Sequence, residues 1–421
     1  MMSTWPTVFV RELVQADEAA IKTGPFGTQL KAAEYVEHGV PVINVRNIGF
    51  GTIRDEKLEF IDDTTANRLN SHRLRSNDIV FGRKGAVERH VLIGPNQNGW
   101  IQGSDCLRLR LNPGRIIPRF ASYCLLLDHH KSWIMGQASH GATMPTLNQD
   151  IIERIELPQP PPSTQRRIVS ILSAYDDLIE NNTRRIAILE EMARRLFEEI
   201  QSESAPSSET MTLGEIADRV GGLVKTGPFG SQLHESDYTQ EGIPVVMPKD
   251  IIGGRVSTMS IARIDEDTTK RLNHHQLLEG DIVYGRRGDI GRRALIRRRQ
   301  VGYLCGTGCL RISVHGDVIA PRYLFAYLGL PEVIAEIAGK AVGATMPNLN
   351  TSILRGVQIQ VPPMKAQKRY VEAAADLDDL AETLLEANQR LRAARDLLLP
   401  KLISGEIDVS RAPLPVEIAA E

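Results

Sequence analysis

The sequence contains no hydrophobic run of about eighteen residues, the length that a membrane-spanning helix needs, and no signal-peptide pattern. Cysteine is scarce, since only 4 occur among 421 residues and no two of them form a CxxC pair. A disulfide framework and a thiolate zinc site are therefore not expected. We expect a cytoplasmic protein without membrane association, whose cysteines are small buried hydrophobic residues.

Recognisable catalytic motifs are also missing. The chain has no GxxxxGK[ST] phosphate loop, no HExxH metal motif and no Cys/His cluster at zinc-ligand spacing. Two proline-rich runs, LPQPPPS and QVPPM, lack the aromatic residue of the motif with which amino-group methyltransferases hold their target. The histidine pairs at 129–130 and 274–275 are expected to be solvated. We predict that the chain is not an enzyme by itself and has no metal or cofactor of its own.

The net charge of −2 conceals strong local bias. Gly285–Arg299 is densely basic, whereas Glu372–Glu386 is acidic. With 421 residues, of which 42% are hydrophobic and 24% charged, the chain is long enough for two or three globular domains. The basic segment favours a surface that binds nucleic acid.

The chain is an internal duplication. Three segments recur in the same order, at an offset of 203 residues from Lys22 to Lys225 that becomes 202 after a one-residue deletion. They are KTGPFG (Lys22–Gly27 and Lys225–Gly230), DIVFGRKG or DIVYGRRG (Asp78–Gly85 and Asp281–Gly288), and GATMPTLN or GATMPNLN (Gly141–Asn148 and Gly343–Asn350). Each copy is a head with short predicted strands and helices, separated by turns rich in Gly, Pro and Asn, and a helix follows each head.

Heptad spacing predicts two long helices, the first over Thr164–Ile200 and the second from Ala373 onward. The first seam comprises Ile168, Leu172, Tyr175, Ile179, Ile186, Leu189, Leu196 and Ile200, with Asn182 and Ala193 in its gaps, and the second comprises Ala373, Leu377, Leu380, Leu384, Ala387, Leu391, Ala394 and Leu398. Such a seam needs a partner helix, and we expect the two to form an antiparallel intramolecular coiled coil. The first helix would span about 55 Å.

We therefore predict an α+β fold in which two repeated mixed α/β heads are separated by the two long helices. The predicted boundaries are 1–162 for the first head, 163–201 for the first helix, 202–210 for a polar linker, 211–363 for the second head, 364–406 for the second helix and 407–421 for a tail. Pro400 is expected to kink or end the second helix.

Two repeated loops are candidate contacts to DNA. KTGPFG combines cations with glycines that permit close approach of the backbone to a phosphate; a tight turn that buries Phe26 and Phe229 is the structural alternative. GRKG and GRRG place two cations between flexible glycines at a strand end, as a phosphate clamp or a base-reading loop would. The candidate DNA-binding residues of these loops are Lys22, Thr23, Arg83, Lys84, Lys225, Thr226, Arg286 and Arg287.

Positions that differ between the heads are candidates for sequence specificity, because identical positions cannot make the heads recognise different sequences. Arg46-Asn47 is replaced by Lys249-Asp250, and Gly94–Asn96 by Arg297–Arg299. Arg, Lys and Asn carry donors that match guanine and adenine edges, although an exposed polar face is an equal alternative. This adds Arg46, Asn47, Lys249, Asp250, Arg297 and Arg299 to the candidate DNA-binding residues.

The long helices carry repeated charges outside their seams. The candidate partner-docking residues are Arg166, Arg167, Asp176, Asp177, Lys368, Arg369, Asp378 and Asp379. A heptad helix is usually a packing device, and this pair is expected to be one. Charges repeated on both halves would also suit two copies of one partner, bound pseudo-symmetrically.

In this order, and duplicated, these segments make the whole chain resemble the specificity (S) subunits of type I restriction–modification systems. The resemblance rests on KTGPFG, DIVFGRKG, DIVYGRRG, GATMPTLN…LPQPPPSTQRRIV, GATMPNLN…VPPMKAQKRYV and ARDLLLPKLISGEI at Ala394–Ile407. Met144 and Met346 depart from the family pattern, which more often has Gln there. The resemblance implies that each head is a target recognition domain that reads one half of a split DNA site, and that the helices set the spacer.

The resemblance further implies double-stranded DNA, two methyltransferase (M) subunits and restriction (R) subunits as partners. The M subunits would bind S-adenosylmethionine and methylate adenine N6. Because the loops around Arg46 and Lys249 differ, we predict an asymmetric bipartite site rather than a palindrome. Two other classes stay open: a stand-alone bivalent DNA-binding regulator, and an assembly scaffold built on the coiled coil.

Overall fold

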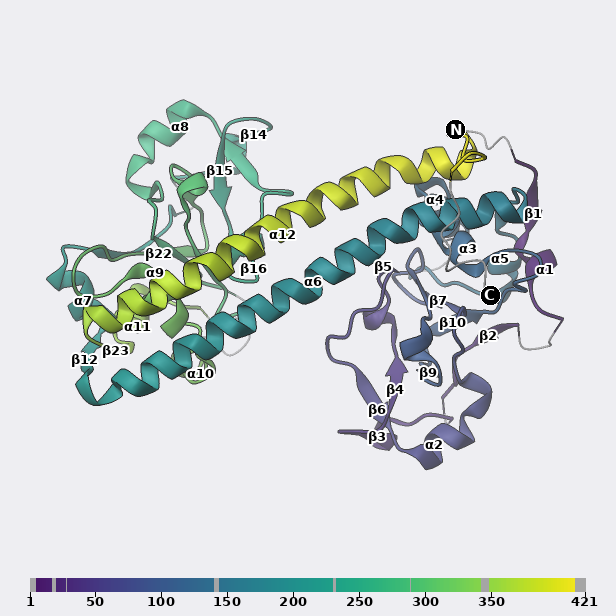
Figure 1. The fold of residues 1–421 in the computed structure, drawn as a ribbon, viewed down its shortest axis with the longest axis horizontal. Coiled ribbons are helices and arrows are strands. Elements are labelled where there is room, and N and C mark those ends of the chain that lie inside the picture. Colours follow the sequence, from purple (N-terminus) through teal and green to yellow (C-terminus); the bar gives the residue numbers. More distant parts are fainter. Residues whose placement is uncertain are drawn as a thin grey trace. The chain divides into compact units, whose positions relative to one another are not determined.

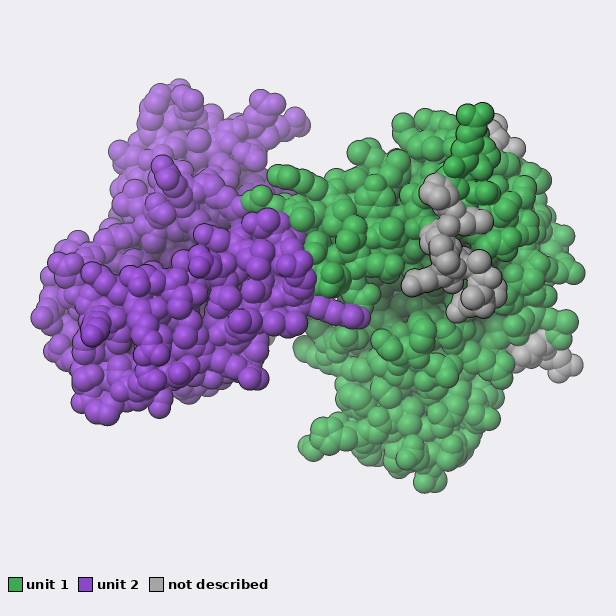
Figure 2. Space-filling view, in the orientation of Figure 1, with its two compact units in different colours: residues 1–182, 386–421 green, residues 183–385 purple. Residues whose placement is uncertain are grey.

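The structure is a computed structural model that describes residues 5–16, 20–27, 29–139, 144–229, 232–287, 289–341 and 348–412. The chain divides into two compact units, unit 1 with residues 1–182 and 386–421 and unit 2 with residues 183–385 (Figure 2). Each unit contains one head and part of both long helices (Figure 1). The predicted loops at Gly141–Asn148 and Gly343–Asn350 fall partly outside the described residues, as do Gly230, Gly288 and residues 413–421 of the tail.

The described part of the first head combines short strands with short helices. Its strands are β1 (Thr7–Phe9), β2 (Ile21–Thr23), β3 (Tyr35–Val36), β4 (Val40–Ile43), β5 (Phe50–Gly51), β6 (Glu59–Ile61), β7 (Ile79–Gly82), β8 (His90–Leu92), β9 (Ile101–Gln102), β10 (Cys106–Leu109) and β11 (Glu156–Pro158). Its helices are α1 (Val10–Leu13), α2 (Asp63–Arg68), α3 (Pro118–Leu125), α4 (Asp128–Ala138) and α5 (Gln149–Glu153). The strands form sheets of order β2-β10-β7-β8-β5 and β3-β6-β4-β9 and the separate pair β1-β11.

The described part of the second head repeats this plan. Its strands are β12 (Glu209–Thr212), β13 (Leu223–Thr226), β14 (Tyr238–Thr239), β15 (Ile243–Val246), β16 (Ile251–Ile252), β17 (Arg255–Val256), β18 (Ala262–Ile264), β19 (Ile282–Gly285), β20 (Arg293–Leu295), β21 (Leu304–Cys305), β22 (Cys309–Ser313) and β23 (Gln358–Val361). Its helices are α7 (Leu213–Arg219), α8 (Glu266–Arg271), α9 (Pro321–Tyr327), α10 (Pro331–Lys340) and α11 (Thr351–Arg355). The sheets have the orders β13-β22-β19-β20 and β14-β18-β15-β21, with the pairs β16-β17 and β12-β23.

The repeated DIVFGRKG and DIVYGRRG segments form strands inside these sheets. β7 pairs antiparallel with β8 and β10, and β19 pairs antiparallel with β20 and β22. All four residues of each strand are buried, which explains why the segments read as continuous apolar runs. Phe81 of β7 and Tyr284 of β19 lie in the main cores of their units. The cationic loops that follow β7 and β19 are therefore held by rigid, buried strands.

The last residue of each GATMPTLN-type segment starts a helix. The Asn148 side chain accepts a hydrogen bond from the Ile151 N–H at 2.9 Å and caps α5, and Asn350 accepts one from the Ile353 N–H at 2.8 Å and caps α11. Such caps satisfy a backbone donor that a helix N-terminus otherwise leaves unpaired. The repeat of Asn at this position thus has a local structural cause.

The two long helices are α6 (Pro162–Ser204) and α12 (Met364–Ser404). Hydrogen bonds, ion pairs and packing join Asp176 to Arg395 and Asn182 to Asn388 in unit 1, and Ile186 to Leu384 and Glu203 to Arg369 in unit 2. Rising numbers in α6 meet falling numbers in α12, so the helices run antiparallel within each unit (Figure 1). The predicted α+β class, with repeated heads and an antiparallel helix pair, is confirmed.

The seam predicted for α6 is confirmed, and the seam predicted for α12 is confirmed at Leu384 but wrong by one residue at Ala373 and Leu380. On α6, Ile168, Leu172, Ile179 and Ile186 are buried. On α12, Ala373 and Leu380 are exposed, whereas Ala374, Ala381 and Asn388 are buried. The prediction failed because it placed leucines in the seam, whereas the buried positions of α12 include two alanines and one asparagine.

A buried polar pair lies within the corrected seam. The Asn182 side-chain amide donates to the Asn388 side-chain oxygen at 3.0 Å, and the Asn388 amide donates to the Ile179 carbonyl at 3.2 Å. The two asparagines therefore satisfy each other and the backbone in a seam that is otherwise mainly apolar.

A repeated glutamine ties each head to its long helix. Gln165 is buried; its side-chain oxygen accepts from the Ile117 N–H at 2.9 Å, and its amide donates to the Pro160 carbonyl at 2.9 Å. Gln367 makes the same two bonds with the Ala320 N–H at 2.7 Å and the Pro362 carbonyl at 2.8 Å. Buried backbone groups beside both helix starts are thereby satisfied.

The predicted linker is wrong, and of the two effects expected of Pro400 the structure excludes the helix end. The segment 202–210, expected as a linker, continues α6 to Ser204, makes a 3-10 turn at Ala205–Ser207 and enters β12, which pairs with β23. α12 runs past Pro400 to Ser404, so this proline does not end the helix. None of the described helices has the combination of length and apolar character needed to cross a membrane.

Candidate nucleic-acid interface

Three loops of the first head meet where β7 ends: the loop after β2, the loop after β7 and the loop before α5. The Arg83 guanidinium carbon lies 4.6 Å from the centroid of the Phe26 ring. The Arg83 carbonyl accepts from the Leu147 N–H at 2.8 Å, and the Gly85 N–H donates to the Pro145 carbonyl at 3.0 Å. We call the surface formed by these loops the three-loop surface of the first head.

The second head has the same three-loop surface. The Arg286 guanidinium carbon lies 5.8 Å from the Phe229 ring centroid, and its Nε donates to the Leu349 carbonyl at 2.9 Å. The Leu349 N–H donates back to the Arg286 carbonyl at 2.9 Å, and Arg287 pairs with Asn348 in an antiparallel bridge. Segments that are far apart in the sequence are thus brought together twice, by an equivalent backbone hydrogen bond from Leu147 to Arg83 and from Leu349 to Arg286.

The phenylalanines of these surfaces are exposed, with 49% of Phe26 and 55% of Phe229 accessible to solvent. The structural alternative, in which the loop buries both rings, is therefore wrong. A guanidinium over an aromatic face is oriented by a cation–π contact, and its remaining donors stay available. An exposed ring beside an oriented arginine is suited to the sugar–phosphate backbone of DNA and to base edges.

The first glycine of each GPFG loop is explained by packing inside the head. A Cβ on Gly24 would lie 1.8 Å from the Gly103 carbonyl oxygen, and one on Gly227 would lie 2.1 Å from the Gly306 carbonyl oxygen. Any larger residue at these positions would push the loop away from its neighbour. These glycines therefore place Phe26 and Phe229.

The neighbouring cations differ between the two surfaces. Lys84 is exposed, and its ammonium lies 3.3 Å from the Asp105 carboxylate. Arg287, at the equivalent position, is also exposed but has no ion pair in the part of the chain that the structure describes. Gly308 replaces Asp105 in the second head, so the second three-loop surface is the more positive of the two.

Lys22, Thr23, Lys225 and Thr226 belong to strands that lead into these surfaces. Lys22 pairs with Arg108 across β2 and β10, and Lys225 pairs with Arg311 across β13 and β22. Lys225 is exposed, whereas Lys22 is half-buried. These four residues stay predicted DNA contacts.

Two equivalent histidines are buried close to these lysines. Burial, reinforced by the positive charges of Lys22 and Arg108, lowers the pKa of His72 to about 4. Burial, with nearby cationic groups that include Lys225, also lowers the pKa of His275 to about 4. Both imidazoles are therefore neutral at pH 7.

The predicted solvation of the histidine pairs holds for only one member of each. His129 and His274 are exposed, whereas His130 and His275 are buried, with 6% and 4% of their surfaces accessible. The prediction is therefore wrong for His130 and His275. Burial lowers the pKa of His130 to about 3.

Two candidate specificity residues are structural. Asn47 is fully buried: its oxygen accepts from the Asn44 N–H at 3.1 Å and its amide donates to the Arg54 carbonyl at 2.9 Å. Asp250 is 4% exposed and accepts from the Met247 N–H at 3.0 Å. The prediction that these two side chains contact DNA is wrong, because both are committed to closing a turn.

Their neighbours remain on the surface. Arg46 is about half exposed and makes an ion pair with Glu59, and Lys249 is exposed. Each directly precedes the buried residue that closes its turn. Arg46 and Lys249 therefore stay candidates for DNA recognition, presented on a turn of fixed shape.

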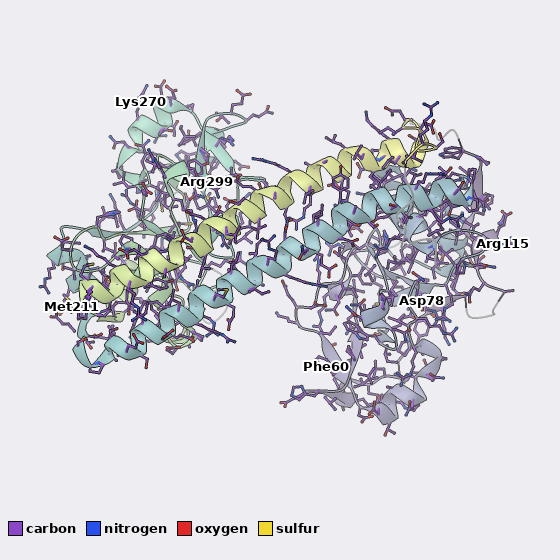
Figure 3. All side chains as sticks on the ribbon, viewed as in Figure 1. Phe60, Asp78, Arg115, Met211, Lys270 and Arg299 are labelled. Atoms are coloured by element: carbon purple, nitrogen blue, oxygen red, sulfur yellow. The ribbon has the colours of Figure 1, made fainter. Side chains whose placement is uncertain are left out.

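The basic segment of the second head faces its own long helices. Arg299, which is labelled in Figure 3, makes an ion pair with Glu382 of α12. The nitrogens of Arg297 lie 3.5 Å from Asp378 and 3.7 Å from Glu382. Arg255 lies 2.8 Å from the same Glu382 carboxylate. α12 thus supplies counter-charges to Arg297 and Arg299, which removes the electrostatic reason for predicting that they bind DNA.

The proposed docking charges divide into internal and external ones. Asp176 accepts from the Tyr123 hydroxyl at 2.6 Å and pairs with Arg395 at 2.7 Å. Asp378 pairs with Arg322 and Arg297, Arg369 pairs with Glu203 at 2.6 Å, and Arg167 donates to the Ala412 carbonyl at 3.0 Å. The exposed members of the set are Arg166, Asp177, Lys368, Asp379 and Arg369, the last of which pairs with Glu203 at the surface.

Two charge partners of candidate site residues were missed because their signal is not local. Glu382 forms ion pairs with three arginines, and Asp105 forms one with Lys84. In the sequence, both residues look like ordinary surface charges. Only the comparison of Asp105 with Gly308 in the other repeat could have singled out Asp105.

Comparison with known proteins shows which family both halves of the chain match. Residues 2–191 and 207–392 each match the type I restriction modification DNA specificity domain. The chain is 24% identical over 391 residues to the putative type I restriction enzyme MjaX specificity subunit of Methanocaldococcus jannaschii, covering 88% of each. It is 26% identical over 300 residues to the MjaIX specificity subunit of the same organism, covering 68% of each. The crystal structure of the type I restriction-modification S subunit from M. genitalium has a similar fold, with a TM-score of 0.58, 18% identity, and coverage of 95% of this chain and 96% of that one.

Proposed function

This chain belongs to the type I restriction–modification DNA specificity family, and we propose that it is the DNA-recognition subunit of such a system. Each head contacts one half of a bipartite DNA site through its three-loop surface. The observation that carries this proposal is the duplicated pair of an exposed phenylalanine and an arginine held over its ring, Phe26 with Arg83 and Phe229 with Arg286.

The residues that are identical in the two surfaces bind DNA independently of its base sequence. Residues shared by both heads cannot distinguish two different half-sites, and a guanidinium with free donors is suited to phosphate oxygens. Sequence discrimination then belongs to exposed positions that differ, namely Arg46 against Lys249 and Lys84 against Arg287. Because these residues differ in donor geometry, the two half-sites differ and the complete site is asymmetric.

Catalysis belongs to partners in this proposal. Two M subunits dock on the long helices, bind S-adenosylmethionine and methylate adenine N6, and R subunits join for cleavage. The chain itself contributes no catalytic residue. The long helices set the number of base pairs between the half-sites.

Long-read sequencing of N6-methyladenine tests the proposal. The chain is expressed in a methylation-free host with and without the M subunit of the same system. A split, asymmetric motif should be methylated only when both are present. No new methylation, although chain and M subunit form an intact complex, would contradict DNA recognition. Failure to form any complex would favour an unrelated scaffold role.

Arginine variants then test whether the arginines held over Phe26 and Phe229 contact DNA. Arg83→Gln and Arg286→Gln together should weaken DNA binding by the complex and reduce the slope of log affinity against log salt by roughly 0.9 per lost phosphate contact. Arg83→Lys with Arg286→Lys is the matched control, because it keeps both charges but removes the planar group that stacks on phenylalanine. Unchanged affinity and salt slope in the glutamine variant would exclude the three-loop surfaces as DNA contacts.

A further inference from the structure

One tripeptide, Asp-Asp-Leu, stands at equivalent positions of the two long helices. It occupies Asp176–Leu178 on α6 and Asp378–Leu380 on α12. The first copy belongs to unit 1 and the second to unit 2. Each copy is therefore presented by the helix that follows its own head in the sequence.

The first aspartate of each copy has a role inside its unit. Asp176 bonds to Tyr123 at 2.6 Å and to Arg395 at 2.7 Å. Asp378 bonds to Arg322 and lies 3.5 Å from Arg297. Packing of head against helix explains this residue in both copies.

Packing does not explain the leucine. Leu178 is 51% exposed and Leu380 is 41% exposed, although the heptad pattern of the sequence would place Leu380 in the seam. Lys, Gln or Glu would be equally good helix formers at these positions without exposing an apolar side chain. A single exposed leucine is common in proteins, but this one recurs at the same place in both repeats.

The second aspartate is exposed beside each leucine. Asp177 makes no ion pair within the described ranges, and the Asp379 side chain is 80% exposed with a nitrogen of Arg297 at 3.8 Å. An apolar anchor next to a carboxylate is complementary to an apolar pocket with a basic rim.

We propose that Asp177 with Leu178 and Asp379 with Leu380 form two equivalent anchor patches, each of which binds one copy of the same partner. This inference rests on the proposed function and identifies that partner as the M subunit. Each leucine inserts into an apolar pocket of one M subunit, and the neighbouring aspartate meets a Lys or Arg at the rim of the pocket. Two patches on one chain give a complex with two M subunits.

Other exposed apolar side chains of the helices lack this repetition. Ile188 and Leu397 are 59% and 69% exposed, but their equivalents in the other repeat are Arg390 and Arg195. A surface groove runs along Ile188 and Met192 of α6, whose equivalents on α12 are Arg390 and Ala394. These side chains cannot bind two copies of one partner in the same way, so they serve as matched controls.

Native mass spectrometry of the chain with the M subunit of the same system tests the proposal. The unmodified chain should bind two M subunits, Leu178→Gln and Leu380→Gln one each, and the double variant none at concentrations that saturate the unmodified chain. At each patch the affinity should fall on the order of thirtyfold, as for an anchor residue at an interface centre. Ile188→Gln and Leu397→Gln should still bind two. Circular dichroism checks that the exposed substitutions leave the helices folded.

Two outcomes separate the proposal from its premise. If the unmodified chain binds no M subunit, the proposed function fails. If the unmodified chain binds two M subunits and the double variant still binds two with unchanged affinity, the anchor patches are wrong while the proposed function stands. Loss of both copies from a single variant would also overturn the assignment of one copy to each patch.

Discussion

The contact between the strand β8 and the helix α3 in the first head is made by His90, whose ring nitrogen lies 3.0 Å from the Ser122 hydroxyl. In the second head Arg293 takes the place of this histidine; its Nε donates to the Phe325 carbonyl at 3.0 Å, and Phe325 stands where the first head has Ser122. The frame is shared, but the polar side chains that complete it are different. The heads can therefore be expected to fold alike and to respond differently to charge and pH.

A second exchange concerns the buried carboxylate that precedes the central strand. Asp78 is paired with Arg110 through two bonds of 2.7 and 2.8 Å. Asp281, its equivalent, lies 2.7 Å from Arg311 and 3.1 Å from His315. Arg311 corresponds to Arg108 rather than to Arg110, so the two heads neutralise the same carboxylate from different strand positions.

The largest effect is expected from breaking this buried pair. Asp78→Ala leaves the buried guanidinium of Arg110 without its counter-charge, and should destabilise unit 1 by about 3–5 kcal/mol. Arg110→Ser, which installs the residue of the second head, should cost clearly less, because Arg108 can turn to Asp78 as Arg311 does to Asp281. Hydrogen exchange resolved by unit would measure both. Equal losses would show that Arg108 cannot replace Arg110.

The next largest effect is expected from acidic pH, which should destabilise unit 1 more than unit 2. Burial lowers the pKa of His90 to about 4, and His72 and His130 of unit 1 are also held neutral, whereas Arg293 and Val333 stand at two of these positions in unit 2. An unfolded histidine has a pKa of about 6.5, so the stability from a neutral buried histidine is complete above that pH and is lost as the pH falls toward 4.

The expected size follows from His90, which is completely buried. At pH 5 the burial of neutral His90 should lower the free energy of unfolding of unit 1 by about 2 kcal/mol, since pH 5 is roughly 1.5 units below the pKa of an unfolded histidine. The difference between the two units should exceed this value, because His130 of unit 1 is also buried and neutral, whereas His72 is matched by His275 of unit 2. Hydrogen exchange at pH 7 and pH 5 measures it; equal acid sensitivity of both units would contradict the assignment.

A smaller effect is expected from the basic segment. Arg297→Gln with Arg299→Asn removes the charges that face Glu382, and should destabilise unit 2 by about 1–3 kcal/mol because the pairs are partly buried. DNA affinity of the intact complex should not change. A large loss of affinity without loss of stability would return these arginines to the DNA-binding set.

The smallest effect concerns the charge difference between the three-loop surfaces. Asp105→Gly gives the first head the residue of the second and frees Lys84 from its partner at 3.3 Å. DNA affinity should rise about two- to threefold, with a slope against log salt steeper by at most about 0.9. The reverse change, Gly308→Asp, should weaken binding. The slope is measured by salt titration of the complex on duplex DNA.

The sequence was sufficient for the architecture because the repeat and the heptads are periodic signals. It was insufficient where burial depends on a distant partner. Asn47 and Asp250 resemble surface polar residues until the turn closes around them, and the arginines at 297 and 299 resemble a DNA-binding run until α12 places Glu382 beside them. Phe26 shows the opposite case, since the sequence allowed this apolar residue a place in the core, whereas its loop presents it to solvent.

The most direct test of the account is an exchange of one head. Residues 1–162 are replaced by the first head of a relative with a different methylated motif, and N6-methyladenine is sequenced with the same M subunit. The account predicts that one half of the split motif changes to that of the relative, while the other half stays. A motif in which both halves change, or neither does, would contradict the claim that each head reads one half-site.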